Sequence, residues 1–201
     1  MLTKPLKLSS KYLLGLLIAL GSVSCTTTVP PSYTESTGVS EGFVGMDATE
    51  MLYAHNVVRA DVGLPALRWS NKLAQYAQDW ADHLANQEGC RMIHRFEQRQ
   101  NQANYGENLF WASSMNWNDG RVSEPQSINS SYVAYDWASE KQFYSYNANH
   151  CRPGEECGHY TQMVWRNTTD VGCAVSLCPE NGQIWVCNYN PPGNWQGERP
   201  Y

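Results

Sequence analysis

His159 is the residue of this 201-residue sequence best placed to do chemistry. It lies in residues 157–175, CGHYTQMVWRNTTDVGCAV, a stretch that also holds two cysteines. The loose alternation over 160–165 predicts one strand, 171–177 a second, and the polar residues 166–170 a turn between them. At the mouth of such a hairpin, the imidazole of His159 would face a cleft, where it could bind a metal ion or transfer a proton. Its partners must come from elsewhere in the chain.

The common catalytic motifs indicate no active site in this sequence. There is no HExxH helix to set the ligand geometry of a zinc protease, and GxSxG occurs only as GVSEG at residues 38–42, where no predicted strand and helix flank it to expose a nucleophilic serine. We assign Ser139 and Thr161 no catalytic role, because the sequence does not show that either hydroxyl lies beside the imidazole of His159. Three of the other histidines have no acid at a catalytic spacing and are predicted to be structural: His55 in hydrogen bonds, His83 facing solvent and His150 in a loop.

The seven cysteines divide into an even set and one extra, Cys25. The six in the body of the chain predict disulfides rather than a zinc site, because the chain begins with an export signal and has no CxxC pair. Six cysteines allow fifteen pairings, and the residues alone do not choose among them. These six are Cys90, Cys151, Cys157, Cys173, Cys178 and Cys187.

The N-terminus, residues 1–24, is predicted to be a signal peptide, because lysines precede an apolar run that is too short to span a bilayer. Two alternatives then apply to Cys25. A bacterial lipoprotein pathway would cut before it and acylate it, which explains an unpaired cysteine; ordinary cleavage would leave a free thiol, and Ser22 stands where a lipobox usually has leucine. We expect an exported protein at the cell-envelope surface or outside the cell, with a lipid anchor at Cys25 as the favoured alternative.

Residues 25–45 are predicted to be a flexible tether, because they are rich in Thr, Ser, Pro and Gly and have no apolar period. The formal charge is −5, and without the three lysines of the signal peptide eleven basic residues face 19 acidic ones. This balance argues against nucleic acid and anionic lipid surfaces as partners. We expect membrane contact only through a lipid at Cys25.

The folded domain is predicted to span residues 46–201 and to begin with a helix over 47–61. Asp47 and Glu50 fit a capping box, and Gly63 would stop the helix. Residues next to this first helix therefore set both its start and its end.

Three more elements follow. Ser70 caps a second helix that Gly89 ends, and its apolar stripe comprises Leu73, Ala77, Trp80, Ala81, Leu84 and Ala85. A third helix is predicted over 125–139, with an inner face of Ile128, Tyr132, Val133 and Trp137. A last strand is predicted over 184–189. Helices that precede a small antiparallel sheet indicate an α+β domain.

Several motifs together resemble one family. GHYTQMVWRNTTDVGCA, from 158, is similar to the first signature of the CAP proteins (the cysteine-rich secretory, antigen 5 and pathogenesis-related 1 superfamily), and VCNYNPPGNWQG, from 186, to the second. AHNVVRADVGLPALRW, YGENLFW and WASEKQFY resemble the plant pathogenesis-related 1 branch. The pieces occur in the order of the family over most of the chain, which makes a joint chance match negligible.

The resemblance implies a three-layer α-β-α sandwich with a small antiparallel sheet, stabilised by disulfides. The implied disulfides are Cys90 with Cys178, Cys173 with Cys187, and Cys151 with Cys157. It also implies a cleft lined by two histidines and two acids, at the matching positions His94, Glu107, Glu140 and His159.

Two neutral imidazoles, those of His94 and His159, are good ligands for Zn²⁺ or another divalent metal ion. Glu107 and Glu140 could orient the imidazoles, or one of them could act as a general base on a metal-bound water. The alternative is a buried His–Glu network that satisfies only its own hydrogen bonds.

The resemblance implies a secreted or surface-anchored binding module for a small hydrophobic ligand, such as a sterol or another lipid, or for a partner protein. The aromatic residues around the loop 112–131 are predicted either to line an apolar groove or to pack into the core; they are Trp111, Trp117, Tyr132 and Tyr135.

Two other functions remain open. A metal-dependent peptidase or esterase of the cell envelope would use Glu107 and Glu140 for catalysis. A structural or signalling protein would act through its surface or its tail, residues 191–201, which resembles a segment that some plant members release. Otherwise we expect this tail to cap the sheet, with Trp195 as its anchor.

Overall fold

The computed structural model describes residues 43, 45–98 and 102–201. The predicted signal peptide (residues 1–24), Cys25 and nearly all of the tether lie outside these residues, so those expectations stay predictions. In the part of the chain that is described, no helix is both long enough and apolar enough to cross a membrane.

The first helix, α1 (Ala48–Ala60), begins where the sequence predicts. The carboxylate of Asp47 accepts a hydrogen bond from the backbone N–H of Glu50 at 2.9 Å, which caps the first turn. Gly63 follows the helix with a φ of +74°, in the left-handed region that glycine adopts without strain. Both ends of α1 are therefore set by residues next to it.

The second helix, α2 (Asn71–Gln87), is capped by the hydroxyl of Ser70, which accepts from the N–H of Leu73 at 3.3 Å. All six residues of its predicted apolar stripe are buried. The helix lies so close to the sheet that a Cβ on Gly172 would stand 2.3 Å from the backbone nitrogen of Ala74. Only glycine fits at that strand position.

Two long antiparallel strands, β7 (Asp170–Leu177) and β8 (Gln183–Asn190), form the centre of the sheet. The strand β2 (Gly106–Ala112) pairs antiparallel with β8, and the two-residue β1 (Arg68–Trp69) pairs parallel with β7. The strand order is β1-β7-β8-β2. The small sheet is antiparallel as expected, apart from the short β1.

The strand prediction for residues 160–165 was wrong, because the chain forms the helix α4 (Gly158–Met163) there. The carboxylate of Glu140 accepts hydrogen bonds from the backbone N–H groups of His159 and Tyr160, at 3.0 and 3.1 Å, and so caps the first turn. This cap comes from a residue 19 positions earlier, so local sequence does not reveal it. The hairpin is formed by β7 and β8 instead.

The third helix, α3 (Ser130–Ser139), is shorter than predicted, because the side chain of Asn129 caps it by accepting from the N–H of Tyr132 at 2.8 Å. Pro125 belongs to a short strand before it. Tyr132 is 56% exposed and was wrongly placed on the inner face, whereas the other predicted inner residues are buried: Ile128, Val133 and Trp137.

The remaining elements are short. Two-residue strands pair antiparallel in two small ribbons, and one 3₁₀ turn continues α3. These elements are β3 (Ser114–Met115), β4 (Glu124–Pro125), η1 (Glu140–Phe143), β5 (Tyr144–Ser145) and β6 (His150–Cys151).

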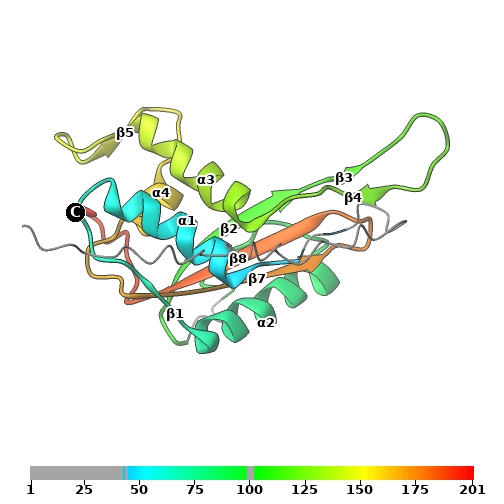
Figure 1. Ribbon diagram of the computed structural model, residues 1–201, viewed down its shortest axis with the longest axis horizontal. Helices are drawn as coiled ribbons and strands as arrows, with labels where there is room; N and C mark the ends of the chain where they lie inside the picture. Colours follow the sequence, from blue (N-terminus) through cyan, green and yellow to red (C-terminus); the bar gives the residue numbers. More distant parts are fainter. Residues whose placement is uncertain (1–42, 44, 99–101) are drawn as a thin grey trace, which may run out of the picture. The chain divides into compact units, whose positions relative to one another are not determined.

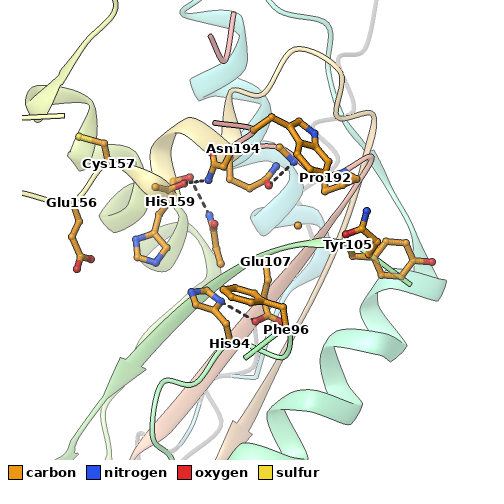
Figure 2. A pocket seen from close by; sticks show the side chains of 16 residues that line it. His94, Phe96, Tyr105, Glu107, Glu156, Cys157, His159, Pro192 and Asn194 are labelled. Atoms are coloured by element: carbon orange, nitrogen blue, oxygen red, sulfur yellow. Dashed lines mark hydrogen bonds and ion pairs between the residues drawn. The ribbon is translucent and has the colours of Figure 1, made fainter. Parts of the chain in front are cut away.

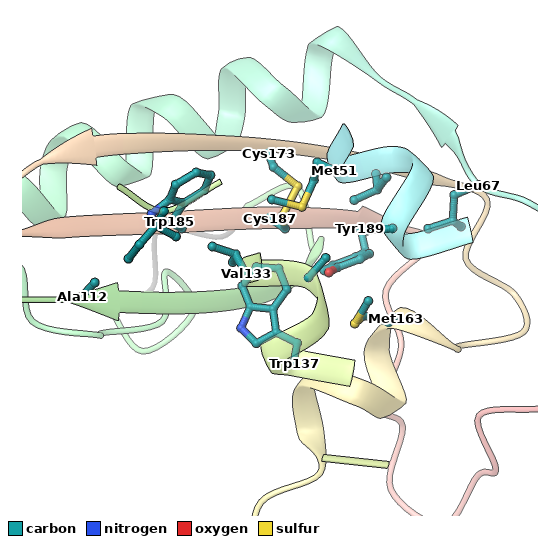
Figure 3. Close-up of a cluster of buried hydrophobic side chains, with 14 residues drawn as sticks. Met51, Leu67, Ala112, Val133, Trp137, Met163, Cys173, Trp185, Cys187 and Tyr189 are labelled. Atoms are coloured by element: carbon teal, nitrogen blue, oxygen red, sulfur yellow. A yellow bond between two sulfur atoms is a disulfide. The ribbon is translucent and has the colours of Figure 1, made fainter. Parts of the chain in front are cut away.

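The domain is a three-layer α-β-α sandwich. In Figure 1, α2 covers one face of the sheet, and α1, α3 and α4 cover the other. Because side chains alternate along a strand, β8 supplies both cores. Ile184 and Val186 pack with α2, while Trp185, Cys187 and Tyr189 pack with the other helices. Figure 3 shows this second core, with the side chains of α1, α3 and α4 gathered over the sheet.

Three disulfides join the pairs that the resemblance implies. Cys173 and Cys187 lie directly opposite each other on β7 and β8, and their bond faces the core drawn in Figure 3. Cys90 and Cys178 connect the loop after α2 to the end of β7. The third bond, between Cys151 and Cys157, closes a short loop directly before α4.

The C-terminal tail packs on the loop around β5 rather than through Trp195, which is 49% exposed. The ring of Tyr201 stacks on Tyr146, with centroids 4.7 Å apart. The carbonyl of Pro200 accepts from the N–H of Arg166 at 2.5 Å. The last residues, not Trp195, therefore hold the tail.

Candidate functional site

Two histidine–glutamate pairs form the chemical centre of the domain. The Nδ1 of His94 lies 2.9 Å from the Oε1 of Glu107, which stands at the start of β2. The Nδ1 of His159, in the first turn of α4, lies 2.6 Å from the Oε1 of Glu140, at the junction of α3 and η1. The two pairs therefore have the same hydrogen bond between Nδ1 and a carboxylate oxygen, although different elements supply their residues.

Each carboxylate also holds the backbone next to its histidine. Glu107 accepts from the N–H of Arg95 at 3.0 Å and from the side-chain amide of Asn188 at 3.3 Å. Glu140 accepts from the two N–H groups at the start of α4. Because a carboxylate only accepts hydrogen bonds, the Nδ1 of both rings carries a proton, and in the neutral ring Nε2 presents its lone pair.

Aromatic side chains fix the planes of both imidazoles. The ring of His159 stacks on Trp137 of α3, with centroids 6.0 Å apart. The ring of His94 stacks on Phe96, with centroids 5.3 Å apart. Hydrogen bonds and stacking together preorganise each ring, which is the arrangement that holds histidine ligands in metal sites.

Both histidines line one cleft of about 640 Å³, a volume typical of small-molecule sites. Figure 2 shows His94 with Glu107 on one wall and His159 on the other. Glu140 stands behind His159 and is not part of the lining. The rim adds apolar surface from Phe96, Pro192 and Trp195. The cleft therefore combines paired imidazoles with aromatic walls.

The four predicted residues meet in this region but do not form one ligand group. Among the described residues, the side chains that bring donor atoms within 4.8 Å of one another are Glu140, Glu156 and His159. No such group of three includes His94 in residues 43, 45–98 and 102–201. The sequence reasoning missed Glu156, an exposed acid beside Cys157.

A buried hydrogen-bond chain supports the floor of the cleft. The hydroxyl of Tyr189 donates to the Nε2 of His55 at 2.9 Å and accepts from the amide of Asn108 at 3.0 Å. The same amide donates to the carbonyl of His159 at 3.1 Å. Burial lowers the pKa of His55 to about 4 and raises the pKa of Tyr189. His55 is structural, as predicted.

The other polar residues considered from the sequence lie outside the chemistry. His83 is not solvent-facing as predicted, because its ring stacks on Trp80 with centroids 4.7 Å apart and its side chain is 19% exposed. His150 is exposed in β6. The hydroxyls of Ser139 and Thr161 donate to carbonyl groups, and neither forms a hydrogen bond with a histidine among the described residues.

Three of the aromatic residues around residues 112–131 line two separate pockets. Trp111 lines a separate pocket of about 430 Å³ beside the Cys90–Cys178 disulfide. Tyr132 and Tyr135 line another, of about 440 Å³, on α3. Neither pocket includes a residue of the histidine cleft, and the apolar groove stays a prediction.

The chain belongs to the CAP family. The family model described as the cysteine-rich secretory protein family matches residues 52–189, which include both His–Glu pairs and all six paired cysteines.

Sequence relatives place the chain near one branch of that family. It is 44% identical over 153 residues to the pathogenesis-related protein PR-1 of Medicago truncatula, covering 76% of this chain and 78% of the relative. It is 41% identical over 152 residues to the pathogenesis-related protein 1C of Nicotiana tabacum, covering 76% and 79%.

Solved structures agree on the fold. The venom allergen-like protein 4 of Schistosoma mansoni matches with a TM-score of 0.53 and 26% identity, covering 77% of this chain and 92% of that one. The crystal structure of NaASP2 with Zn²⁺ matches with a TM-score of 0.55 and 21% identity, covering 84% and 88%. The latter likeness shows the fold alone.

Proposed function

We propose that this chain is an exported binding protein of the pathogenesis-related 1 type, which holds a divalent metal ion and a small ligand in the histidine cleft. One observation carries the proposal: two preorganised imidazoles face the same cleft, each with its Nδ1 hydrogen-bonded to a carboxylate. Neither Nε2 has a partner among the described residues. Neutral imidazoles held in this way suit Zn²⁺ or a similar ion.

The bonding of the two acids supports binding over hydrolysis. Glu107 and Glu140 each accept three hydrogen bonds, and their side chains are only 5% and 14% exposed. A general base needs an oxygen free to take a proton from water. A metal-dependent peptidase or esterase that used either acid as its base would therefore have to give up one of these hydrogen bonds, which makes hydrolysis the weaker alternative.

The walls of the cleft support a ligand with an apolar part. Phe96, Tyr105 and Trp195 offer ring faces, and Pro192 extends that surface. We propose a sterol or another lipid as the ligand class, with a partner protein as the alternative. A structural or signalling role through the surface or the tail would leave this cleft unused.

The N-terminal sequence supports export and surface attachment. Residues 1–24 would be removed, and an acylated Cys25 with the tether up to residue 45 would hold the domain at the cell envelope. Mass spectrometry of the mature protein checks this proposal, since a diacylated or triacylated Cys25 supports the anchor and an unmodified cysteine contradicts it.

Calorimetric titration of the oxidised full-length chain with Zn²⁺ tests the function. Wild type should bind one ion per chain, and the double variant His94→Ala/His159→Ala should lose that binding. His150→Ala removes an exposed histidine outside the cleft and serves as the matched control. Absence of binding in wild type, or equal binding in the double variant, would refute the metal part of the proposal.

Ligand capture needs its own assay. A fluorescent sterol should bind wild type, and Trp195→Ala, which removes a large ring from the cleft rim, should weaken that binding. Trp111→Ala is the control, because this tryptophan is similarly exposed but lines a different pocket. If both variants bind the sterol as wild type does, the cleft is not the lipid site.

A further inference from the structure

A third acidic side chain lies beside one of the two pairs. One donor atom from each of Glu140, Glu156 and His159 lies within 4.8 Å of the other two. Figure 2 shows Glu156 near His159 and away from His94. The walls of the cleft are therefore unequal, and the side chains able to bind a metal ion concentrate on the wall that α4 forms.

The two carboxylates on this wall differ in how many hydrogen bonds their oxygens already accept. Both oxygens of Glu140 are occupied, one by the ring of His159 and the other by two backbone N–H groups. Glu156 is exposed and forms no hydrogen bond or ion pair with any residue in the described part of the chain. Glu140 is therefore suited to hold the histidine, and Glu156 to bind an ion.

The charges on this wall favour a cation. Two carboxylates this close repel each other, and neither pairs with a lysine or arginine among the described residues. A divalent ion between Glu156 and His159 would relieve that repulsion. Carboxylate oxygen combined with imidazole nitrogen is a donor set that Zn²⁺ accepts readily.

The disulfide loop holds Glu156 in position. Glu156 immediately precedes Cys157, which is bonded to Cys151 across a separation of six residues. Cys157 in turn is the residue directly before α4, the helix that carries His159. Backbone motion at Glu156 is thus limited by the disulfide and by the capped helix, which lowers the entropic cost of recruiting its carboxylate to an ion.

We infer that Glu156 is a ligand of the divalent ion in the cleft, together with His159, and that Glu140 is the positioning residue for the imidazole. The inference rests on the proposed function, since it takes the cleft to be the cation site. It adds an anionic oxygen ligand from the disulfide loop to the imidazoles that the family resemblance implies.

The test compares two neighbouring acids. Glu156→Gln and Glu155→Gln remove the same charge from adjacent exposed positions, so long-range attraction changes about equally in both. Zn²⁺ affinity of the oxidised full-length chain is measured by calorimetry at physiological ionic strength. Glu156→Gln should weaken binding by at least about tenfold, because even outer-shell partners of a metal contribute that much. Glu155→Gln should bind as wild type does.

The outcomes separate this inference from the proposed function. If Glu156→Gln binds like wild type while His94→Ala/His159→Ala does not bind, the cleft is the cation site and Glu156 is no ligand. If both glutamine variants weaken binding equally, only general charge attraction acts and the inference is wrong. If wild type binds no Zn²⁺, the metal part of the proposed function fails with it. Thermal unfolding without metal checks that each variant remains folded.

Discussion

At the residue scale, the floor of the cleft depends on a histidine that must stay neutral. His55 is fully buried, with its Nδ1 donating to the carbonyl of Met51 at 2.8 Å and its Nε2 accepting from Tyr189. Burial penalises the charged imidazolium and, with the nearby Arg59, lowers the pKa of His55 from 6.5 to about 4. Protonation would also remove the acceptor that the tyrosine hydroxyl needs.

The pH dependence of stability follows from that pKa. Between about pH 6.5 and 4 the unfolded chain binds a proton at His55 and the folded protein does not, so acidification favours unfolding. We predict that the free energy of unfolding falls by up to about 1.4 kcal/mol per pH unit in this window from His55 alone. Above pH 7 this contribution should be constant.

Denaturant unfolding from pH 7.5 to 4.5 checks the prediction in wild type and His55→Gln. The glutamine keeps a polar side chain but does not titrate, so its stability should decline less steeply with acid. Parallel pH profiles for the two proteins would mean that His55 does not couple protonation to folding.

The residues of the site were predictable to different degrees. His94, Glu107, Glu140 and His159 follow from matching short motifs, and the structure places each at the cleft or directly behind it. Glu156 could not be found in this way, because nothing in its local sequence shows that residues 140 and 156 meet in space. That proximity arises only when α4 forms and the disulfide loop folds back.

At the element scale, the helices that were predicted correctly are those whose capping residues are neighbours in the sequence. The starts of α1 and α2 follow from Asp47 and Ser70, and the strands β7 and β8 from their apolar runs. The helix α4 was mistaken for a strand because it is six residues long and its cap is distant. A second contact between residues far apart in the sequence also holds α4: the guanidinium of Arg59 donates to the carbonyl groups of Met163 and Trp165 at 2.9 Å each.

The contact between α2 and β7 should tolerate no side chain at Gly172. A Cβ there would lie 2.3 Å from the nitrogen of Ala74 and 2.5 Å from the carbonyl oxygen of Ser70, and backbone atoms cannot rotate away. We predict that Gly172→Ala destabilises the fold by about 3 kcal/mol, at the upper end of typical overpacking costs.

The matched control is Gly158→Ala, where a Cβ meets nothing within 4 Å and the residue begins a helix. Its midpoint in thermal unfolding should stay close to that of wild type. Similar melting temperatures for Gly172→Ala and wild type would show that α2 can move away from the sheet without cost.

At the scale of the whole molecule, a disulfide stabilises the domain more when it encloses a longer stretch of chain, by an amount that grows with the logarithm of the loop length. Cys90 and Cys178 are separated by 88 residues and join the end of α2 to the sheet, whereas Cys151 and Cys157 are separated by six. The layered architecture followed from the family resemblance, since no local pattern shows that α2 lies alone on its face of the sheet. The parallel β1 could not be predicted from two residues.

Removing the two disulfides should have unequal effects. In the chain-entropy model the long loop contributes about 5 kcal/mol and the short one about 2 kcal/mol. We predict that Cys90→Ala/Cys178→Ala lowers the free energy of unfolding by more than Cys151→Ala/Cys157→Ala does, as measured by urea denaturation. Equal losses would show that strain or residual structure, not loop length, governs their contribution.

The short disulfide should matter more for the site than for the fold, because it holds the loop of Glu156 beside His159. Anomalous diffraction shows directly whether the cleft holds a divalent cation. Crystals of the oxidised chain grown with Zn²⁺ would be measured on both sides of the zinc absorption edge. We predict one strong anomalous peak in the cleft, in contact with His159 and Glu156. Peaks confined to surfaces outside the cleft, or no peak at all, would contradict the account.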